Sequence, residues 1–216
     1  MPTAPAPSRG AFLSLDGPDG GGKTTQAARL AAWLRGLGRD VVACREPGGT
    51  ALGERLRSIL LDRSSAAVGL RAEMLLFMAS RAQLVEEVIR PALEAGQVVV
   101  SDRYLLASVV YQGYAGGLPV EAIWEAGRAA TGGLLPDLTL VLDLPTAAAR
   151  ARVGPARDRI EDRPVAYHDR VRAGFAEAAR SYPAPIRTID ASGDPDAVAD
   201  RVRHEVADAL ALDPRP

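Results

Sequence analysis

The segment GPDGGGKT at residues 17–24 constrains the fold of this chain more than any other part of the sequence. It follows an apolar run at 11–16 (AFLSLD), which is typical of a buried strand. Helical periodicity starts after it, at Gly22 or Lys23, and continues to about Leu37. A glycine-rich turn between a strand and a helix points successive backbone N–H groups at one spot, and the helix start adds the positive end of its dipole. The pattern G-x-x-x-x-G-K-T in this context predicts a phosphate-binding loop, or P-loop.

Within such a loop each residue type has a task on the nucleotide. Lys23 is expected to reach the β- and γ-phosphates of ATP, and the hydroxyl of Thr24 is expected to bind Mg²⁺. Lys23 is also the only lysine among the 26 lysine and arginine residues, which indicates a position where a compact charge is required and the planar fork of arginine fails. The residues expected to bind ATP are Gly17, Pro18, Asp19, Gly20, Gly21, Gly22, Lys23, Thr24 and Thr25.

Apolar runs that alternate with helical patterns predict the fold class. The apolar runs lie at 11–16, 41–45, 97–102, 138–144 and 186–190. After the P-loop helix, the helical patterns lie at about 52–61, 71–95, 105–114, 119–131, from 146, at 165–181 and at 194–211. Such alternation favours a parallel sheet covered by helices on both faces. We therefore expect an α/β fold of the P-loop type, with three α/β/α layers and a five-stranded parallel sheet.

The length of 216 residues suits one compact domain with at most a small mobile insert. We expect a disordered tail at 1–10, a single P-loop domain at 11–212 and, within it, an arginine-rich lid at about 150–163. The tail lacks the apolar core of a secretory signal, and no apolar run approaches the roughly 20 residues that span a bilayer. Cys44 is the only cysteine, so no internal disulfide can form. These features predict a cytoplasmic protein without membrane contact.

Composition narrows the class of nucleotide-binding protein further. The formal net charge is −1, which argues against a general electrostatic grip on nucleic acid. The chain has no asparagine and no second lysine, so the Asn-Lys-x-Asp motif with which GTPases read guanine is absent, as is an LSGGQ-like signature of ABC-type ATPases. A large mechanical ATPase needs a longer chain. Of the classes of P-loop protein considered, the one that remains is a kinase that acts on a small molecule.

Two further features fit such a kinase. Asp102 ends the third apolar run, where a carboxylate directed at the metal belongs in this class of proteins. An arginine-rich stretch follows the fourth run and contains Arg150, Arg152, Arg157 and Arg159. A loop of this kind that folds over ATP would bring guanidinium groups onto the transferring phosphoryl group and would exclude water.

The scarcity of histidine bears on the acceptor. Only two histidines are present, whereas a kinase that phosphorylates a hydroxyl usually needs a general base. The phosphate of a nucleoside monophosphate has a second pKa of about 6 and is already dianionic at pH 7. Such an acceptor needs cations that hold its phosphate in line with the phosphates of ATP, and arginine side chains supply these cations. The sequence therefore favours a nucleoside monophosphate as the acceptor.

Four segments make the chain resemble the bacterial thymidylate kinase family over about residues 11–212. They are GPDGGGKTTQ in the loop, REPGGT at 45–50, LLFMASRAQ at 75–83 and DRYLLASVVYQG at 102–113. The resemblance implies transfer of the γ-phosphoryl group of ATP to thymidine monophosphate, with Mg²⁺, in the biosynthesis of thymidine triphosphate. It also implies a homodimer built from helix faces.

The resemblance assigns roles to residues near the phosphates. Asp19 matches an acidic position that contacts the 3′-hydroxyl of the acceptor, and Tyr111 matches one that lies against the deoxyribose. Arg45 and Arg103 match positions that approach the acceptor phosphate. The residues expected to act in catalysis are Lys23, Asp102, Arg103, Arg152 and Arg157. The residues expected to bind the metal are Thr24 and Asp102.

Other matching positions lie near the base. Phe77 matches the ring that stacks on thymine. Arg81 lies one helical turn further on the same face, where the resemblance implies that it donates to a thymine carbonyl. Ser108 matches a polar position that reads the edge of the base.

The lid departs from the family pattern. Glu161 matches a carboxylate of the lid that contacts the substrate region. Ungapped matching places Gly154 where one lid arginine is expected, and it leaves open whether Arg152 or Arg157 takes over that role.

Two other functions remain open at this point. One is another pyrimidine nucleotide kinase or a related nucleotide kinase, for example one that accepts deoxyuridine or guanosine nucleotides. The other is a nucleotide-binding regulator that kept the loop but lost transfer activity. Gly154 favours the regulator, whereas the intact set of Lys23, Thr24, Asp102 and Arg103 favours transfer.

Overall fold

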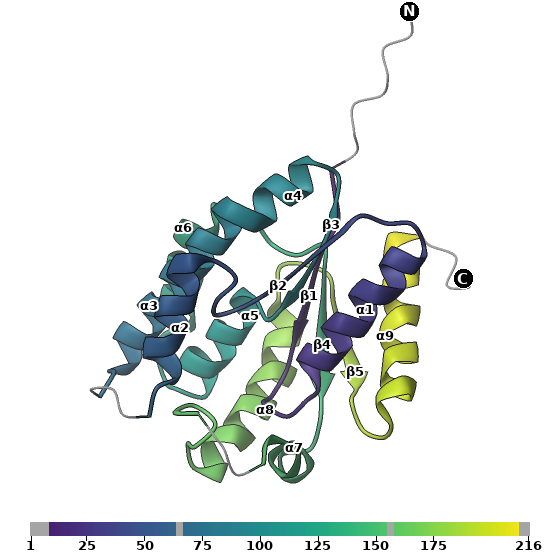
Figure 1. Cartoon of the computed structure of the whole chain (residues 1–216). Helices are drawn as coiled ribbons and strands as arrows, with labels where there is room; N and C mark the ends of the chain where they lie inside the picture. Colours follow the sequence, from purple (N-terminus) through teal and green to yellow (C-terminus); the bar gives the residue numbers. More distant parts are fainter. Residues whose placement is uncertain (1–8, 64–66, 155–157, 212–216) are drawn as a thin grey trace, which may run out of the picture.

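The centre of the protein is a parallel sheet, seen in a computed structural model that describes residues 9–63, 67–154 and 158–211. The strand order is β2-β3-β1-β4-β5, and every neighbouring pair runs parallel (Figure 1). The strands are β1 (Phe12–Asp16), β2 (Val41–Arg45), β3 (Val98–Asp102), β4 (Leu138–Asp143) and β5 (Ile186–Asp190). Each strand ends within one residue of the apolar run that predicted it, so the predicted five-stranded sheet is confirmed.

Helices cover both faces of this sheet, which confirms the predicted α/β/α layers. The helical elements are α1 (Lys23–Gly36), α2 (Ala51–Leu61), α3 (Leu70–Leu84), η1 (Val85–Ile89), α4 (Arg90–Glu94), α5 (Leu105–Ser108), η2 (Val109–Tyr114), α6 (Val120–Thr131), α7 (Thr146–Val153), α8 (Val165–Ser181) and α9 (Pro195–Leu210). Helices α1 and α9 lie side by side on one face, whereas α3, α4, α6 and α8 lie toward the other (Figure 1).

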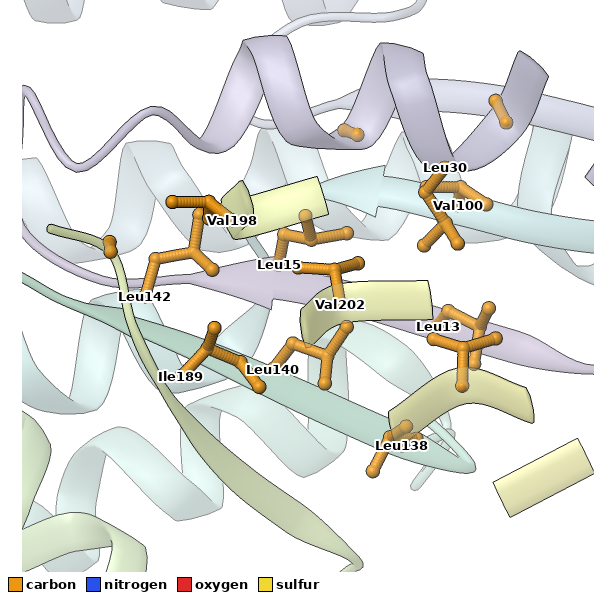
Figure 2. Packing of buried hydrophobic residues seen from close by; sticks show 14 of the residues in the cluster. Leu13, Leu15, Leu30, Val100, Leu138, Leu140, Leu142, Ile189, Val198 and Val202 are labelled. Atoms are coloured by element: carbon orange, nitrogen blue, oxygen red, sulfur yellow. The ribbon is translucent and has the colours of Figure 1, made fainter. Parts of the chain in front are cut away.

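The alternation of side chains along the strands builds these two sides of the core. Leu13 and Leu15 of β1 pack with Leu30 of α1 and Val202 of α9 (Figure 2). The side chain of Phe12, the residue before Leu13, points to the other face and belongs to the cluster with α3, α4 and α6. All three strand residues are fully buried. A strand that is apolar on both sides is what a parallel sheet between two helical layers requires.

Two stretches that the sequence predicts as single helices, 71–95 and 105–114, each contain a π turn, η1 and η2. The N–H of Arg90 donates to the carbonyl of Val85, five residues back, and the next residue, Pro91, has no N–H to donate. One extra residue in a turn hardly changes the spacing of apolar residues. The hydrophobic pattern therefore predicts the helical stretch but not the π turn within it.

The start of the packed chain differs slightly from the prediction. Gly10, expected in the disordered tail, is buried, and its N–H donates to the carbonyl of Leu93 at 2.8 Å. A Cβ at Gly10 would lie 1.9 Å from the carbonyl oxygen of Gln97, so the position requires glycine. Arg9, also expected in the tail, is exposed, and residues 1–8 lie outside the described residues. None of the helices in the described ranges is both long and apolar enough to cross a bilayer.

Candidate active site

A cavity of about 740 Å³ opens at the carboxyl edge of the sheet, where loops that follow parallel strands meet. Most of the residues that the sequence predicts for the site line it: Asp19, Gly20, Gly21, Gly22, Lys23, Thr24, Thr25, Arg45, Phe77, Arg81, Asp102, Arg103, Ser108, Tyr111, Arg152 and Glu161. Gly17 and Pro18 belong to the loop but do not line the cavity. Arg157 lies outside the described residues. The structure thus brings together side chains from five segments of the chain.

The only lysine of the chain, Lys23, is buried within the P-loop. Lys23 is 5% exposed, and its Nζ donates to the carbonyl of Pro18 at 2.6 Å. Burial, together with the nearby Arg103 cation, lowers the pKa of Lys23 to about 8. Gly20 has φ +78° and lies so close to α7 that a Cβ would meet the carbonyl oxygen of Ala149 at 2.0 Å. The loop therefore needs glycine there for both its backbone conformation and its contact with α7.

Thr24 and Asp102 meet where the first turn of α1 faces the end of β3. The Oγ1 of Thr24 donates to Oδ2 of Asp102 at 2.5 Å. A hydroxyl and a carboxylate are oxygen ligands of the kind that Mg²⁺ prefers. This pair fits a bound magnesium ion beside the phosphates.

Arg103 follows β3 in a left-handed conformation with φ +74°, which is uncommon for a residue with a side chain. Its guanidinium is paired with the carboxylate of Asp19, donates to the carbonyl of Gly17 at 3.3 Å and lies over the ring of Tyr111. The hydroxyl of Tyr111 donates to the same carboxylate at 3.0 Å. Burial opposes ionisation of Asp19, but the cations of Arg103 and Lys23 outweigh it and lower its pKa. Asp19 is thus an anion that holds Arg103 and Tyr111 in place.

Two more arginines line the cavity next to Arg103. Arg45 is exposed and its Nη2 lies 3.1 Å from both carboxylate oxygens of Glu54. Arg57, which the sequence analysis missed, donates from Nη1 to the carbonyl of Pro47 at 2.9 Å. Burial and the neighbouring cations Arg45 and Arg103 lower the pKa of Arg57. Three guanidinium groups that repel one another around one cavity favour a bound dianion. The helical pattern around Arg57 gave no sign that this residue lines the cavity.

The far end of the cavity is built around Arg81, which is 1% exposed. Its Nε donates to Glu46 at 2.7 Å, and its terminal nitrogens donate to the hydroxyl of Ser108 at 3.2 and 3.1 Å. Burial raises the pKa of Glu46 to about 7, although the Arg81 cation opposes this shift. Phe77, one turn before Arg81 on α3, lines the same region. Predicted residues for base recognition therefore lie together.

Gln112, which the sequence analysis also missed, lies on this wall one turn after Ser108. The side chain is buried, and its Nε2 donates to Oε1 of Glu73 at 2.9 Å. Within the described residues its Oε1 has no hydrogen-bond partner. A buried carbonyl oxygen without a partner is costly, and Gln112 is one of the residues that line the cavity. The sequence feature that could have indicated a role for Gln112 is its polar side chain, four residues after Ser108 in the same helical stretch.

The arginines of the lid separate into different roles. Arg152 lies on α7 and donates to the carbonyls of Ala191 and Gly193 at 3.2 and 3.5 Å. Arg159, which the sequence analysis placed over the transferring phosphoryl group, is instead paired with Glu73 at 2.7 Å. The reason is that the buried carboxylate of Glu73 requires cationic partners. Arg150 is likewise not part of the main cavity and lines a small cleft beside α7.

Glu161, two residues after Arg159, lines the cavity. Its Oε2 accepts from the N–H of Asp158 at 3.0 Å, and burial raises its pKa. Opposite this segment, the cavity continues past the P-loop to Gly193, Pro195 and Val198, at the start of α9. These last residues were not predicted, although they follow the end of the fifth strand, where parallel sheets place their ligand-binding loops.

Comparison with known proteins agrees with this geometry. The family model described as Thymidylate kinase matches residues 15–202. A thymidylate kinase from Rhizorhabdus wittichii is 48% identical over 205 residues, which is 93% of this chain and 99% of that protein. Those from Leifsonia xyli subsp. xyli and Desulfovibrio desulfuricans are 47% and 44% identical, over 93% and 90% of this chain and 96% and 94% of their own lengths. The chain therefore belongs to the thymidylate kinase family.

Proposed function

We propose that this protein transfers the γ-phosphoryl group of ATP to thymidine monophosphate, giving ADP and thymidine diphosphate for the synthesis of thymidine triphosphate. The observation that carries this proposal is the single cavity that joins the P-loop to the buried cluster of Arg81, Ser108 and Gln112. One end offers backbone amides and Lys23 to a triphosphate, and the other offers a shaped polar wall to a base. Family membership supports transfer rather than a purely regulatory protein.

The phosphate groups meet between these ends. Lys23 and the loop amides would hold the β- and γ-phosphates of ATP, while Arg45, Arg57 and Arg103 would hold the acceptor phosphate. The acceptor is already an anion and needs no general base. The work of the protein is therefore to bring two anions into line and to offset their charge. Arg152, which reaches the cavity from α7, is the described lid arginine that would add charge there.

Mg²⁺ is the second part of the proposal. The hydrogen-bonded pair of Thr24 and Asp102 would hold it at the P-loop. When bound, the ion offsets phosphate charge as the phosphoryl group moves. The remaining tasks, which are to bind, orient and exclude water, belong to the residues already named.

Base recognition rests on Phe77, Arg81, Ser108 and Gln112. Arg81 is a donor, and the free Oε1 of Gln112 is an acceptor. Thymine presents a carbonyl oxygen at C4 next to an N–H at N3, so its edge complements this donor and acceptor. The flat ring of Phe77 would stack on the base. Cytosine presents the opposite pattern at both atoms and would leave buried polar groups unpaired.

A homodimer is the third part of the proposal. Leu52 and Ile59, seven residues apart on α2, are 44% and 46% exposed, and Leu75 on the adjoining α3 is 53% exposed. Large apolar side chains grouped on one surface favour contact with a partner. A second copy of this chain would cover them. We retain the cytoplasm, expected from the sequence, as the place where such an enzyme acts.

An ADP-release assay with a panel of monophosphates tests the proposal. We expect turnover to be highest with thymidine monophosphate, lower with deoxyuridine monophosphate, which keeps the same edge but lacks the methyl group, and lowest with cytidine and purine nucleotides. Omitting Mg²⁺ should abolish turnover. ATP binding without turnover of any acceptor would instead support a regulator.

A further inference from the structure

Glu73 is a buried carboxylate that the mechanism above does not use. It lies on α3, one turn before Phe77, and none of its surface is exposed. Its Oε2 is paired with Arg159 and Arg163, each at 2.7 Å, and its Oε1 accepts from Gln112 at 2.9 Å. A single side chain therefore links α3, η2 and the lid.

The contact with Glu73 dictates the orientation of the Gln112 amide. A carboxylate paired with two guanidinium groups acts only as a hydrogen-bond acceptor. The amide of Gln112 must therefore turn its NH₂ group toward Glu73. Its carbonyl oxygen is then left on the side away from Glu73, and within the described part of the chain it finds no donor. The flipped amide would place two oxygens against each other and is disfavoured.

We propose that Glu73 is a positioning residue that sets the choice of acceptor base through Gln112. By fixing the amide, it presents a hydrogen-bond acceptor to the base edge and so selects a ring nitrogen that carries a hydrogen. Thymine and uracil have such an N–H at N3, whereas cytosine has an acceptor there. This inference rests on the proposed function, because it assumes that a pyrimidine lies between Phe77 and the wall formed by Arg81 and Gln112.

The ion pair between Glu73 and Arg163 provides an internal control, because it uses the carboxylate oxygen that does not contact Gln112. Arg163 donates to Glu73 and stacks over the ring of Tyr167, whose hydroxyl donates to the carbonyl of Tyr111 at 2.7 Å. These contacts of Arg163 hold the end of the lid and do not involve the Gln112 amide. A change in Arg163 should alter the lid while leaving the amide fixed.

The test is the ratio of kcat/KM for thymidine monophosphate to that for deoxycytidine monophosphate. In Glu73→Gln the residue at 73 can donate as well as accept, so Gln112 is free to flip, and we expect the ratio to fall by about tenfold or more. Arg163→Met should lower both kcat/KM values together and keep the ratio. In a Gln112→Met background, Glu73→Gln should no longer change the ratio.

Three results would overturn the inference. They are an unchanged ratio in folded Glu73→Gln, an equal fall of the ratio in Arg163→Met, and a full effect of Glu73→Gln without Gln112. If Glu73→Gln does not fold, the wild-type protein co-crystallised with thymidine monophosphate decides. The inference requires N3 within hydrogen-bond distance of the Gln112 oxygen with the amide nitrogen on Glu73, and any other partner for N3 rejects it. A wild-type protein that does not phosphorylate thymidine monophosphate would contradict the proposed function instead.

Discussion

Lys23 shows at the scale of one residue how this site depends on its ligand. Its ammonium group is buried next to Arg103 and has one carbonyl partner, from Pro18. Both burial and the neighbouring cation disfavour its charge, and the phosphates of a nucleotide would favour it. In the free protein Lys23 therefore loses its proton at a lower pH than an ordinary lysine does.

A pH dependence of ATP binding follows from this residue. With a pKa of about 8, Lys23 is charged below pH 8 and becomes neutral above it. We expect the Kd for ATP to rise between pH 8 and 9.5, by up to about tenfold per pH unit, because bound phosphate favours the charged form. Calorimetric titrations across this range measure the effect.

Substitutions of Lys23 serve as controls for this prediction. Lys23→Arg should bind ATP more weakly, because the planar fork of arginine fits the position poorly, but it stays charged, so its Kd should be flat over the same range. Lys23→Ala should keep the fold and lose turnover by about 100-fold or more. A wild-type Kd that does not change above pH 8 would show that another group carries the charge.

Residues of the site were predictable where neighbours in sequence act together. The loop at 17–24 is contiguous, so its pattern alone indicated where Lys23 and Thr24 would lie. Arg57 and Gln112 could not be found in this way, because their importance comes from partners on other elements. The pairing of Arg159 with Glu73 was missed for the same reason: 86 positions separate them, and no local pattern records the contact.

At the scale of elements, the contact between the P-loop and α7 joins the phosphate site to the lid. Gly20 approaches the carbonyl of Ala149 on α7, and Arg152 extends from the same helix into the cavity. Displacement of the loop would move α7, and displacement of α7 would move Arg152. The two elements must therefore be placed as one unit.

Gly20→Ala tests this coupling. The added Cβ would meet backbone at 2.0 Å in a left-handed conformation, so both the backbone and α7 must shift. We expect a loss of about 1–3 kcal/mol in the free energy of unfolding and weaker ATP binding. Urea unfolding and ATP titration provide the two measurements.

Gly36→Ala, at the end of α1, is the matched control. It has no positive φ and no atom within 4 Å of the added Cβ, so it should leave ATP binding unchanged and raise stability by at most about 1 kcal/mol. Equal ATP affinity in Gly20→Ala and the wild type would contradict the coupling.

Most element boundaries were predictable because apolar runs and helical periodicity extend over many residues. The spacing of apolar residues did not indicate where the backbone changes from an α-helix to a π turn within a helical stretch. The π turn at η2 shifts the residues after Ser108 by part of a turn, and Gln112 lies within it. Its contact with Glu73 thus depends on a backbone detail that apolar spacing does not record.

At the scale of the whole molecule, the apolar side chains on α2 and α3 lie on the outside of the helices that carry Arg57 and Phe77 on the inside. A partner that covers Leu52, Ile59 and Leu75 would press on the two helices that form one wall of the acceptor site. Assembly and acceptor binding are therefore expected to be linked.

We expect Leu75→Arg to shift the protein from dimer to monomer, because a charge at the centre of an apolar contact is costly to bury. Sedimentation velocity measures the change, and the KM for the acceptor should rise with it. Val165→Arg, at an equally exposed apolar position on α8, should leave the assembly state unaltered. A wild-type protein that sediments as a monomer would reject the dimer.

The solitary lysine has a consequence for the chemistry of the entire surface. Apart from the amino terminus, the chain offers acylating reagents one primary amine, and that amine is buried under the P-loop. Reagents that label most proteins at many places thus have a single side-chain target here, at the centre of the nucleotide site. Because a bound nucleotide would cover this amine, labelling at Lys23 is expected to fall as the nucleotide site fills.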